Sequence, residues 1–411
     1  MNKKLIVIAC AMVTTLATSP ASALQFDGFL TSGAAWHDDA NKNRYIGSLG
    51  DRGIQNDASF ETDTRYGLQI SSDIAKDMSV VSQLLGTGVS GNFNAIVEWA
   101  YIDYRPTRWL SIHTGKIKQP VYLVNDYVEV GYAYPWIRPP AEVYYLNNPL
   151  NTVNGIEFLM QFPVGPGMLS FQPYVGSNRD IIPNTGGQAF FEAEKIRGID
   201  VKYSGRGFAV HASSFACEVK LYGGFSPDNT PFNVDLTGEG KCEVNAVGFN
   251  LDMANIVIYA EAQNRLTNET LARPFGDQEA GYVTLGYRFG NWLPHVTYAS
   301  ITGEASSAVD ANGATAITCS DGTGTLCGTP TANVMNFPVA IQTSITAGLR
   351  YEINDSAALK IEHSVVDVEQ DPKALAEANQ GMNFGLFDTS FTNAPPTEKV
   401  GVTSIALDVV F

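Results

Sequence analysis

The sequence has few charged residues and, beyond its first segment, no long hydrophobic run. Charged residues make up 17% of the 411 residues, and 42 Asp and Glu outnumber 26 Lys and Arg, so the formal net charge is -16. Phosphate binding draws on clustered Lys and Arg, and this composition therefore excludes nucleic acid as a partner. After residue 23 no segment approaches the roughly 18 uninterrupted apolar residues of a membrane helix, so the mature chain is no helical membrane protein.

Catalytic and metal-binding motifs are also missing. The sequence has no HExxH, no GxSxG and no glycine-rich phosphate loop. His363 beside Ser364 is the nearest approach to a catalytic pair, but adjacent residues of a strand point to opposite faces. The histidines are scattered singly, at His37, His113, His211, His295 and His363. We therefore predict that the protein is not an enzyme and uses no cofactor and no metal.

The first 23 residues have the pattern of a secretory signal peptide. Lys3 and Lys4 form a basic start, residues 5–17 are apolar, and residues 21–23 read Ala-Ser-Ala, an A-x-A cleavage site. We expect cleavage after Ala23. The mature chain, residues 24–411, is then exported and is predicted to form a single domain.

Four cysteines of the mature chain fall in two close pairs. Cys217 is followed by Cys242, and Cys319 by Cys327, which in an exported protein favours two disulfides. Both intervals are rich in turn residues, so each bridge would close a loop and contribute about 3.5 and about 2.6 kcal/mol respectively. A zinc site is the alternative, but the pairs lie far apart and no histidine stands at ligand spacing.

Apolar and polar residues alternate with a period of two along the mature chain, which predicts β-strands. The last strand shows the pattern, with Ser404, Ala406 and Asp408 between Ile405, Leu407, Val409 and Phe411. Sixteen strands are predicted, at residues 25–36, 59–71, 79–87, 95–105, 109–118, 154–162, 168–176, 197–204, 208–216, 243–252, 255–265, 280–289, 293–302, 343–353, 358–368 and 401–411.

The connections between these strands alternate between short turns and long loops. Long loops are expected at 37–58, 88–94, 119–153, 177–196, 217–242, 266–279, 303–342 and 369–400. Strands of about 10 residues joined in this way are typical of an all-β, antiparallel transmembrane barrel. A β-sandwich also alternates, but rarely needs long loops all at one end. Eighteen strands remain possible, because regions 79–105 and 303–342 alternate weakly.

The signal sequence, the alternating strands, their even number and the terminal Phe411 resemble the Gram-negative outer-membrane porins. Ile405, Leu407, Val409 and Phe411 resemble the signal that the barrel-assembly machinery reads. Residues 115–120, Gly-Lys-Ile-Lys-Gln-Pro, are similar to a porin pattern that phosphate-selective porins share. The resemblance implies a homotrimer among outer-membrane lipid and lipopolysaccharide. It also implies a water-filled channel for small hydrophilic solutes, narrowed by the loop after the fifth strand.

That loop, residues 119–153, is too rich in aromatic residues and proline to lie solvated. A barrel lumen would bury its rings, and charges opposed across a narrow opening would select ions. The candidate constriction residues are the acids Asp126, Glu129 and Glu142 and the bases Arg138, Arg65, Lys116 and Lys118. Two alternatives stay open. Arg138 and Glu142, four residues apart, could simply pair, and the loop could lie outside as a subunit contact.

The charge balance of the sequence bears on the ion selectivity of such a channel. The excess of acid predicts a mild cation preference, although salt screens much of the acid in the loops. The expected inward positions carry both signs, at Arg65, Lys202, Arg288, Arg350, Lys360, Glu61, Asp63, Glu157, Asp200, Glu261, Glu352 and Glu362. A phosphate channel would need a ladder of Arg and Lys, which this sequence does not show. The two candidate functions are a diffusion porin and a plugged barrel that acts as adhesin, receptor or structural anchor.

Overall fold

A computed structural model of the chain gives the positions of most of the mature protein. It describes residues 24–45, 53–88, 93–144, 151–181, 189–225, 231–235, 240–268, 277–304, 341–369, 386–388, 396 and 399–411. The expected signal peptide and most of the expected loops at 303–342 and 369–400 lie outside these residues. The sheet topology and the contacts are those of these residues.

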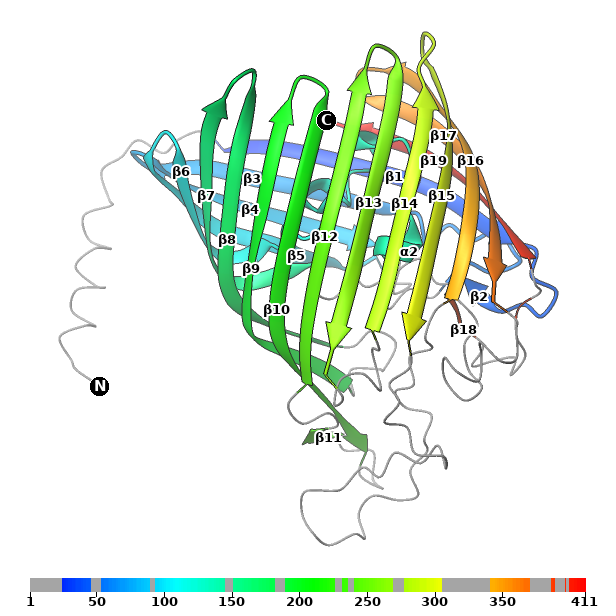
Figure 1. The fold of residues 1–411 in the computed structure, drawn as a ribbon, viewed down its shortest axis with the longest axis horizontal. Helices are drawn as coiled ribbons and strands as arrows, with labels where there is room; N and C mark the ends of the chain where they lie inside the picture. Colours follow the sequence, from blue (N-terminus) through cyan, green and yellow to red (C-terminus); the bar gives the residue numbers. More distant parts are fainter. Residues whose placement is uncertain are drawn as a thin grey trace, which may run out of the picture.

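The main element is a large antiparallel sheet that closes on itself (Figure 1). Each strand pairs with the next along the chain, and β1 pairs with both β19 and β3, which leaves the barrel no free edge. The sixteen strands of the barrel are β1 (Gln25–His37), β3 (Arg65–Ala75), β4 (Met78–Thr87), β5 (Ala95–Thr107), β6 (Leu110–Lys118), β7 (Thr152–Val164), β8 (Gly167–Ile181), β9 (Ala189–Gly205), β10 (Phe208–Phe225), β12 (Gly240–Met253), β13 (Ile256–Thr267), β14 (Asp277–Tyr287), β15 (Trp292–Glu304), β16 (Ile341–Asn354), β17 (Ala357–Val368) and β19 (Lys399–Val410).

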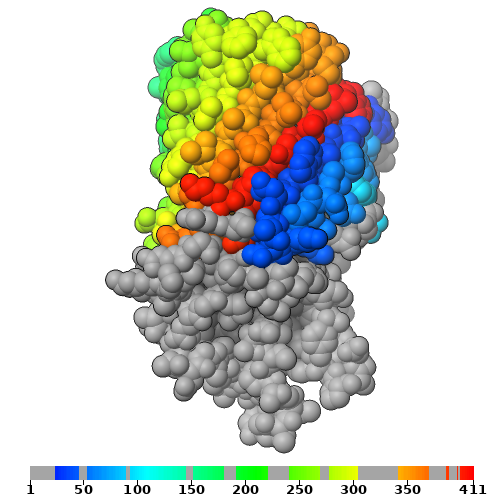
Figure 2. All heavy atoms as spheres, turned by 90° about the vertical axis from the view of Figure 1, so that its right-hand side faces the viewer, coloured from blue at the N-terminus to red at the C-terminus, as the bar shows by residue number. Residues whose placement is uncertain are grey.

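The two ends of the chain meet at the closure of the barrel. Figure 2 shows the C-terminal strand lying beside the N-terminal strand across the surface. Their register pairs Phe29 with Val410 and runs to His37 with Val402. The predicted sixteen-stranded antiparallel barrel is therefore confirmed, and every predicted strand overlaps an observed one.

The two faces of the wall differ in the way that a membrane barrel requires. In β14, Val283 and Leu285 are 46% and 58% exposed on the outside, whereas Thr284 between them is fully buried. In β19, Ile405 and Leu407 face outward, while Asp408 is buried. A sandwich would bury its apolar face instead, and this arrangement of apolar-out and polar-in excludes it.

Short turns gather at one end of the barrel, the upper end in Figure 1. Several of these turns need a left-handed backbone, which glycine adopts without strain. Gly165 between β7 and β8 and Gly207 between β9 and β10 have φ of 57° and 71°. The long connections leave from the opposite end, as the alternation of loop lengths predicted.

The structure corrects two parts of the strand prediction. The strand predicted at 59–71 begins only at Arg65, because the chain turns at Glu61, whose carbonyl accepts a bond from the Thr64 amide. The loops predicted at 177–196 and 217–242 are largely strand. β9 and β10 have 17 and 18 residues, and a short strand, β11 (Pro231–Asp235), adds to β10 beyond the barrel. A separate two-stranded piece joins β2 (Arg44–Tyr45) to β18 (Phe387–Asp388).

The predicted inward loop follows β6 and ends before Thr152, two residues earlier than expected. Its described part, residues 119–144, has two short 3-10 turns and one helical turn. These are η1 (Asn125–Tyr127), η2 (Gly131–Ala133) and α2 (Ala141–Tyr144). The helical turn contacts β13, β14 and β15, and η2 contacts β1 and β19.

Candidate functional site: the loop inside the barrel

The loop enters the barrel directly after β6. Gln119 is fully buried. The carbonyl of Val121 accepts a hydrogen bond of 2.5 Å from the Ser213 hydroxyl in β10. The amide of Leu123 donates at 2.8 Å to Oε1 of Glu261 in β13. Both partners project from the inner face of the wall, so the loop lies in the lumen as predicted, and the alternative of an external loop is wrong.

Two cations of the far wall hold the middle of the loop by its backbone. Lys360 Nζ in β17 donates to the carbonyls of Gly131 at 2.5 Å and Trp136 at 2.6 Å. Arg350 Nη1 in β16 donates to the carbonyl of Tyr134 at 2.8 Å. Carbonyls removed from water need such partners, since an unpaired buried polar group costs about 1–3 kcal/mol. These wall cations are therefore occupied by the loop.

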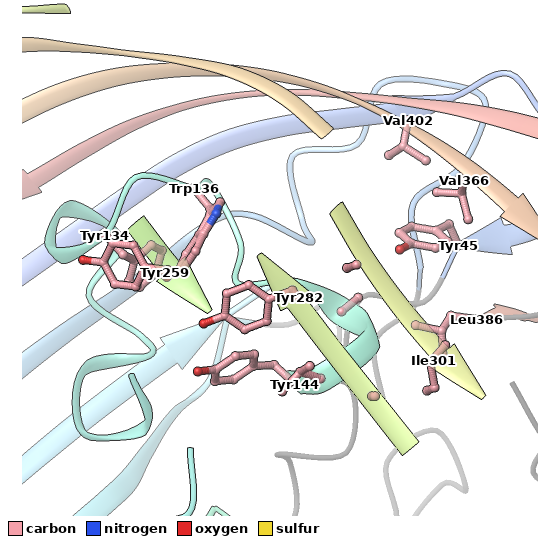
Figure 3. Close-up of a cluster of buried hydrophobic side chains, with 14 of the residues drawn as sticks. Tyr45, Tyr134, Trp136, Tyr144, Tyr259, Tyr282, Ile301, Val366, Leu386 and Val402 are labelled. Atoms are coloured by element: carbon pink, nitrogen blue, oxygen red, sulfur yellow. The ribbon is translucent and has the colours of Figure 1, made fainter. Parts of the chain in front are cut away.

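The aromatic residues of the loop pack against aromatic residues of the wall (Figure 3). The Trp136 ring lies 4.8 Å from Tyr259 and 5.5 Å from Tyr282, both in edge-on contact. Its indole nitrogen donates at 2.9 Å to the Thr284 hydroxyl in β14. Trp136 and Tyr134 are each 1% exposed. The lumen thus supplies both the packing and the hydrogen bonds that the loop composition demanded.

The end of the described loop is fixed in the same way. Tyr144 donates through its hydroxyl at 2.6 Å to Oε2 of Glu261. Burial raises the pKa of Tyr144 well above its ordinary value, so this phenol stays protonated and remains a donor. Glu142, predicted as a constriction acid, is 2% exposed and accepts a bond of 3.0 Å from Gln342. It therefore faces the wall and not the open lumen.

Arg138 and Glu142 do not pair, contrary to the simpler of the sequence interpretations. Arg138 Nη1 lies 2.5 Å from both carboxylate oxygens of Asp63, and Nη2 donates at 2.8 Å to Ser404. Asp63 belongs to the turn that replaces the first half of the strand predicted at 59–71. The predicted pairing with Glu142 is wrong because the Arg138 guanidinium forms its salt bridge with Asp63. Asp63 is distant in the sequence, so the spacing of nearby residues could not reveal this partner.

The other three predicted bases, Arg65, Lys118 and Lys116, lie at different places on the wall and have different partners. Arg65 Nη2 in β3 donates to the Tyr134 hydroxyl at 2.7 Å, and so holds the loop. Lys118 forms a buried ion pair of 2.6 Å with Glu98 at the mouth of the loop. Lys116 donates at 2.8 Å to a backbone carbonyl of the neighbouring strand β5. The structure therefore brings Arg65 and Arg138 to the loop, but not Lys116.

Asp126 and Glu129 are the predicted acids that stay open to the lumen. Asp126 is exposed and Glu129 is half-buried. Glu157 in β7 and Asp200 and Lys202 in β9 lie near enough to interact electrostatically with Asp126. Glu157 and Asp200 are themselves buried in the wall, so Asp126 is the acid of this group that stays open.

Sequence reasoning missed the residues that anchor the loop. Glu261, Glu362, Arg350 and Lys360 were expected to face the lumen, but only as polar lining. Their alternation along the strands could place them on the inner face. It could not show that the loop would reach them from more than 100 positions away in the chain.

The first predicted disulfide is present. Cys217 in β10 pairs directly with Cys242 in β12, with 5.4 Å between their Cα atoms. It joins two paired strands and not two ends of a bare loop, because both strands extend past it. Cys319 and Cys327 lie outside the described residues.

Within the described ranges, no three His, Cys, Asp or Glu side chains gather where they could hold a metal ion. Among the same residues, no helix has the length and apolar character needed to cross a membrane.

The fold is that of the transmembrane β-barrels of the outer membrane. No protein-family model and no curated protein sequence matches the chain. Among solved structures, a loop L8 deletion mutant of OmpT, an outer membrane protein of Vibrio cholerae, has a TM-score of 0.55 at 12% identity. The match covers 95% of this chain and 100% of that one.

Two further structures show the same likeness. Salmonella typhi OmpF in complex with daunomycin has a TM-score of 0.53 at 14% identity, covering 95% of this chain and 98% of that one. The outer membrane channel DcaP of Acinetobacter baumannii has a TM-score of 0.50 at 12% identity, covering 95% and 97%. At such identities the similarity is one of fold alone.

Proposed function

We propose that the protein is a porin of a Gram-negative outer membrane, which lets small hydrophilic solutes and ions diffuse through a water-filled channel. The observation that carries the proposal is the loop of residues 119–144, pinned inside a closed barrel of sixteen strands. Barrels of 16 to 18 strands enclose an aqueous channel, so a single loop narrows the lumen without filling it.

The constriction is proposed to lie beside the loop acids Asp126 and Glu129, with Lys202 of β9 the wall cation that acts on Asp126. Arg138 of the loop and Arg65 of the wall take no part, because they are bound to Asp63 and Tyr134. The loop charges left at the opening, Asp126 and Glu129, are both acidic. A narrow opening lined by acids favours cations, which supports the mild cation preference.

The assembly and location belong to the same proposal. We infer export by the predicted signal peptide, insertion through the barrel-assembly machinery, and a homotrimer in outer-membrane lipid and lipopolysaccharide. A related fold, OmpT of Vibrio cholerae, is described in a trimer form, and DcaP is described as an outer membrane channel. The absence of enzymatic activity, cofactor and metal stays a prediction.

The test is conductance of the purified protein in planar bilayers. A porin produces stable ion currents that, for a trimer, close in three equal steps. A barrel without current would contradict the proposal and favour the second candidate, a plugged adhesin, receptor or anchor. That candidate rests on the depth of the loop, since Tyr132 near its middle reaches the carbonyl of Asn354 at the short-turn end.

A further inference from the structure

Two histidines on the inner wall reach across a glycine of the next strand toward a glutamate on the strand after it. In the first row, His211 of β10 stands opposite Gly248 of β12, which stands opposite Glu261 of β13. His211 Nε2 lies 3.4 Å from Oε1 of that glutamate. The other ring nitrogen, Nδ1, lies 2.9 Å from Asp200 of β9.

The second row repeats this arrangement farther along the same wall, on β15, β16 and β17, with β14 between the two rows. His295 of β15 stands opposite Gly348 of β16, which stands opposite Glu362 of β17. His295 Nε2 lies 3.7 Å from Oε1 of the glutamate. Histidine and glutamate are at most 6% exposed in both rows. Two rows of His, Gly and Glu in lateral register are therefore built into one wall.

The glycine of each row makes room for the imidazole. A Cβ on Gly248 would come within 2.6 Å of Cδ2 and Nε2 of His211. A Cβ on Gly348 would overlap Cε1 and Nε2 of His295. Any other residue would push the ring away from the glutamate. The need for glycine here comes from close approach of a side chain and not from an unusual backbone.

Each glutamate also accepts hydrogen bonds from the loop. Glu261 accepts bonds from the Leu123 amide at 2.8 Å and the Tyr144 hydroxyl at 2.6 Å. Glu362 accepts a bond of 3.1 Å from the Ile137 amide. The glutamates of the two rows thus bind the described loop near its beginning, its middle and its end.

Besides the contact of His211 Nδ1 with Asp200, the backbone of Pro135 in the loop acts on the His295 ring. Nε2 of both His211 and His295 lacks a hydrogen-bond partner among the described residues. A buried polar atom without a partner is costly, and its nearest acidic group is the glutamate of its row. Lys360 and Arg138 also act electrostatically on Glu362, and Tyr282 lies 3.4 Å from Glu261.

We propose that these two rows are positioning sites, in which each histidine orients the glutamate that fixes the constriction loop at a set distance from the wall. The proposal deepens the proposed porin function and rests on it for the consequence that the rows set the width of the channel. The placement of the loop itself can be tested without any current.

The reporter is Ala141→Cys, a small change at a loop position that is 8% exposed and lies against β13, β14 and β15. In the purified barrel, the rate at which a methanethiosulfonate reagent labels this thiol measures how often the loop leaves the wall. The parent chain without the reporter gives the background from native cysteines. Gly248→Ala and Gly348→Ala should each speed labelling about fivefold, the effect of losing one buried hydrogen bond between the loop and the displaced glutamate.

The matched control is Gly281→Ala in β14, where a Cβ would come no closer than 3.1 Å to any atom. It should leave labelling unchanged. His211→Ala combined with Gly248→Ala should label no faster than His211→Ala alone, since removing the ring removes the overlap and leaves only Leu123 Cβ, 3.2 Å from the added methyl group. Glu261→Gln keeps an oxygen acceptor for the Leu123 amide and should loosen the loop less than Glu261→Leu.

Labelling rates equal to those of the parent in both glycine variants would overturn the proposal, as would additive effects in the His211 and Gly248 double variant. A parent barrel that is silent in bilayers would contradict the porin function but leave the labelling result valid. In conducting barrels, the two glycine variants should show noisier open-channel currents than the Gly281→Ala control.

Discussion

Arg138 Nη1 contacts both carboxylate oxygens of Asp63, 75 positions earlier in the chain. The Asp63 side chain is 1% exposed and that of Arg138 is 18% exposed. This contact ties the inward loop to the turn before β3. It also explains why the predicted strand at 59–71 starts late, since the turn holds the acid toward the lumen.

Replacing the cation of this pair should destabilise the barrel more than replacing both partners. Arg138→Gln leaves Asp63 buried and uncompensated, which costs about 3–5 kcal/mol. Asp63→Asn with Arg138→Gln should recover much of that loss. Urea unfolding in detergent measures Arg138→Gln, Asp63→Asn and the double variant. Additive losses in the double variant would mean that the two side chains do not interact.

Removing the open acids of the loop should weaken cation preference. In Asp126→Asn with Glu129→Gln, an ion about 7 Å away loses roughly 0.6 kcal/mol of attraction per charge in water. For the two charges together the cation-to-anion permeability ratio should then fall by a factor of about 8, measured as a shift in reversal potential under a salt gradient. Glu142→Gln is the control, because Glu142 is buried against the wall. An unchanged reversal potential would place Asp126 outside the conducting path.

Breaking the bridge between Cys217 and Cys242 should lower stability and leave conduction intact. The disulfide spans 25 positions, and closing a loop of that length stabilises by about 3.5 kcal/mol in the chain-entropy model. Cys217→Ser with Cys242→Ser should lower the midpoint of thermal unfolding, while single-channel conductance stays at the parent value. A fall in conductance would show that the bridge also shapes the channel.

The tyrosines of the loop should make the protein sensitive to alkali. Burial raises the pKa of Tyr122, Tyr127, Tyr134 and Tyr144 above the ordinary value near 10. Above that pH the unfolded chain loses these protons while the folded chain keeps them, so stability falls as pH rises. Unfolding midpoints should drop above about pH 10, and Tyr144→Phe should reduce the drop. Phenolate absorbance that appears with ordinary pKa in the folded protein would contradict this.

Most of the fold could be predicted from the sequence, because each strand by itself carries the alternation of apolar and polar residues. Val283, Thr284 and Leu285 already show which face meets lipid, whichever strands lie beside them. The strand prediction was wrong where a contact with a residue distant in the sequence overrides the local alternation. Residues 59–64 alternate like a strand, yet they turn so that Asp63 can meet Arg138.

Less of the candidate site could be predicted from the sequence. Aromatic residues and prolines in residues 119–153 were enough to predict that the loop is buried in the barrel. They could not decide which charges remain open. Asp126 stays exposed, whereas Glu142 and Arg138 are taken up by Gln342 and Asp63.

By itself the sequence determined a closed barrel with apolar residues outside, short turns at one end and an aromatic loop in need of burial. Those features depend on periods and compositions that each segment carries alone. Only the tertiary structure decided which wall residues hold the loop, that Cys217 and Cys242 lie in paired strands, and that His211 and His295 reach their glutamates over a glycine. Such contacts depend on the register between strands and on side chains that meet across the lumen, which no local pattern records.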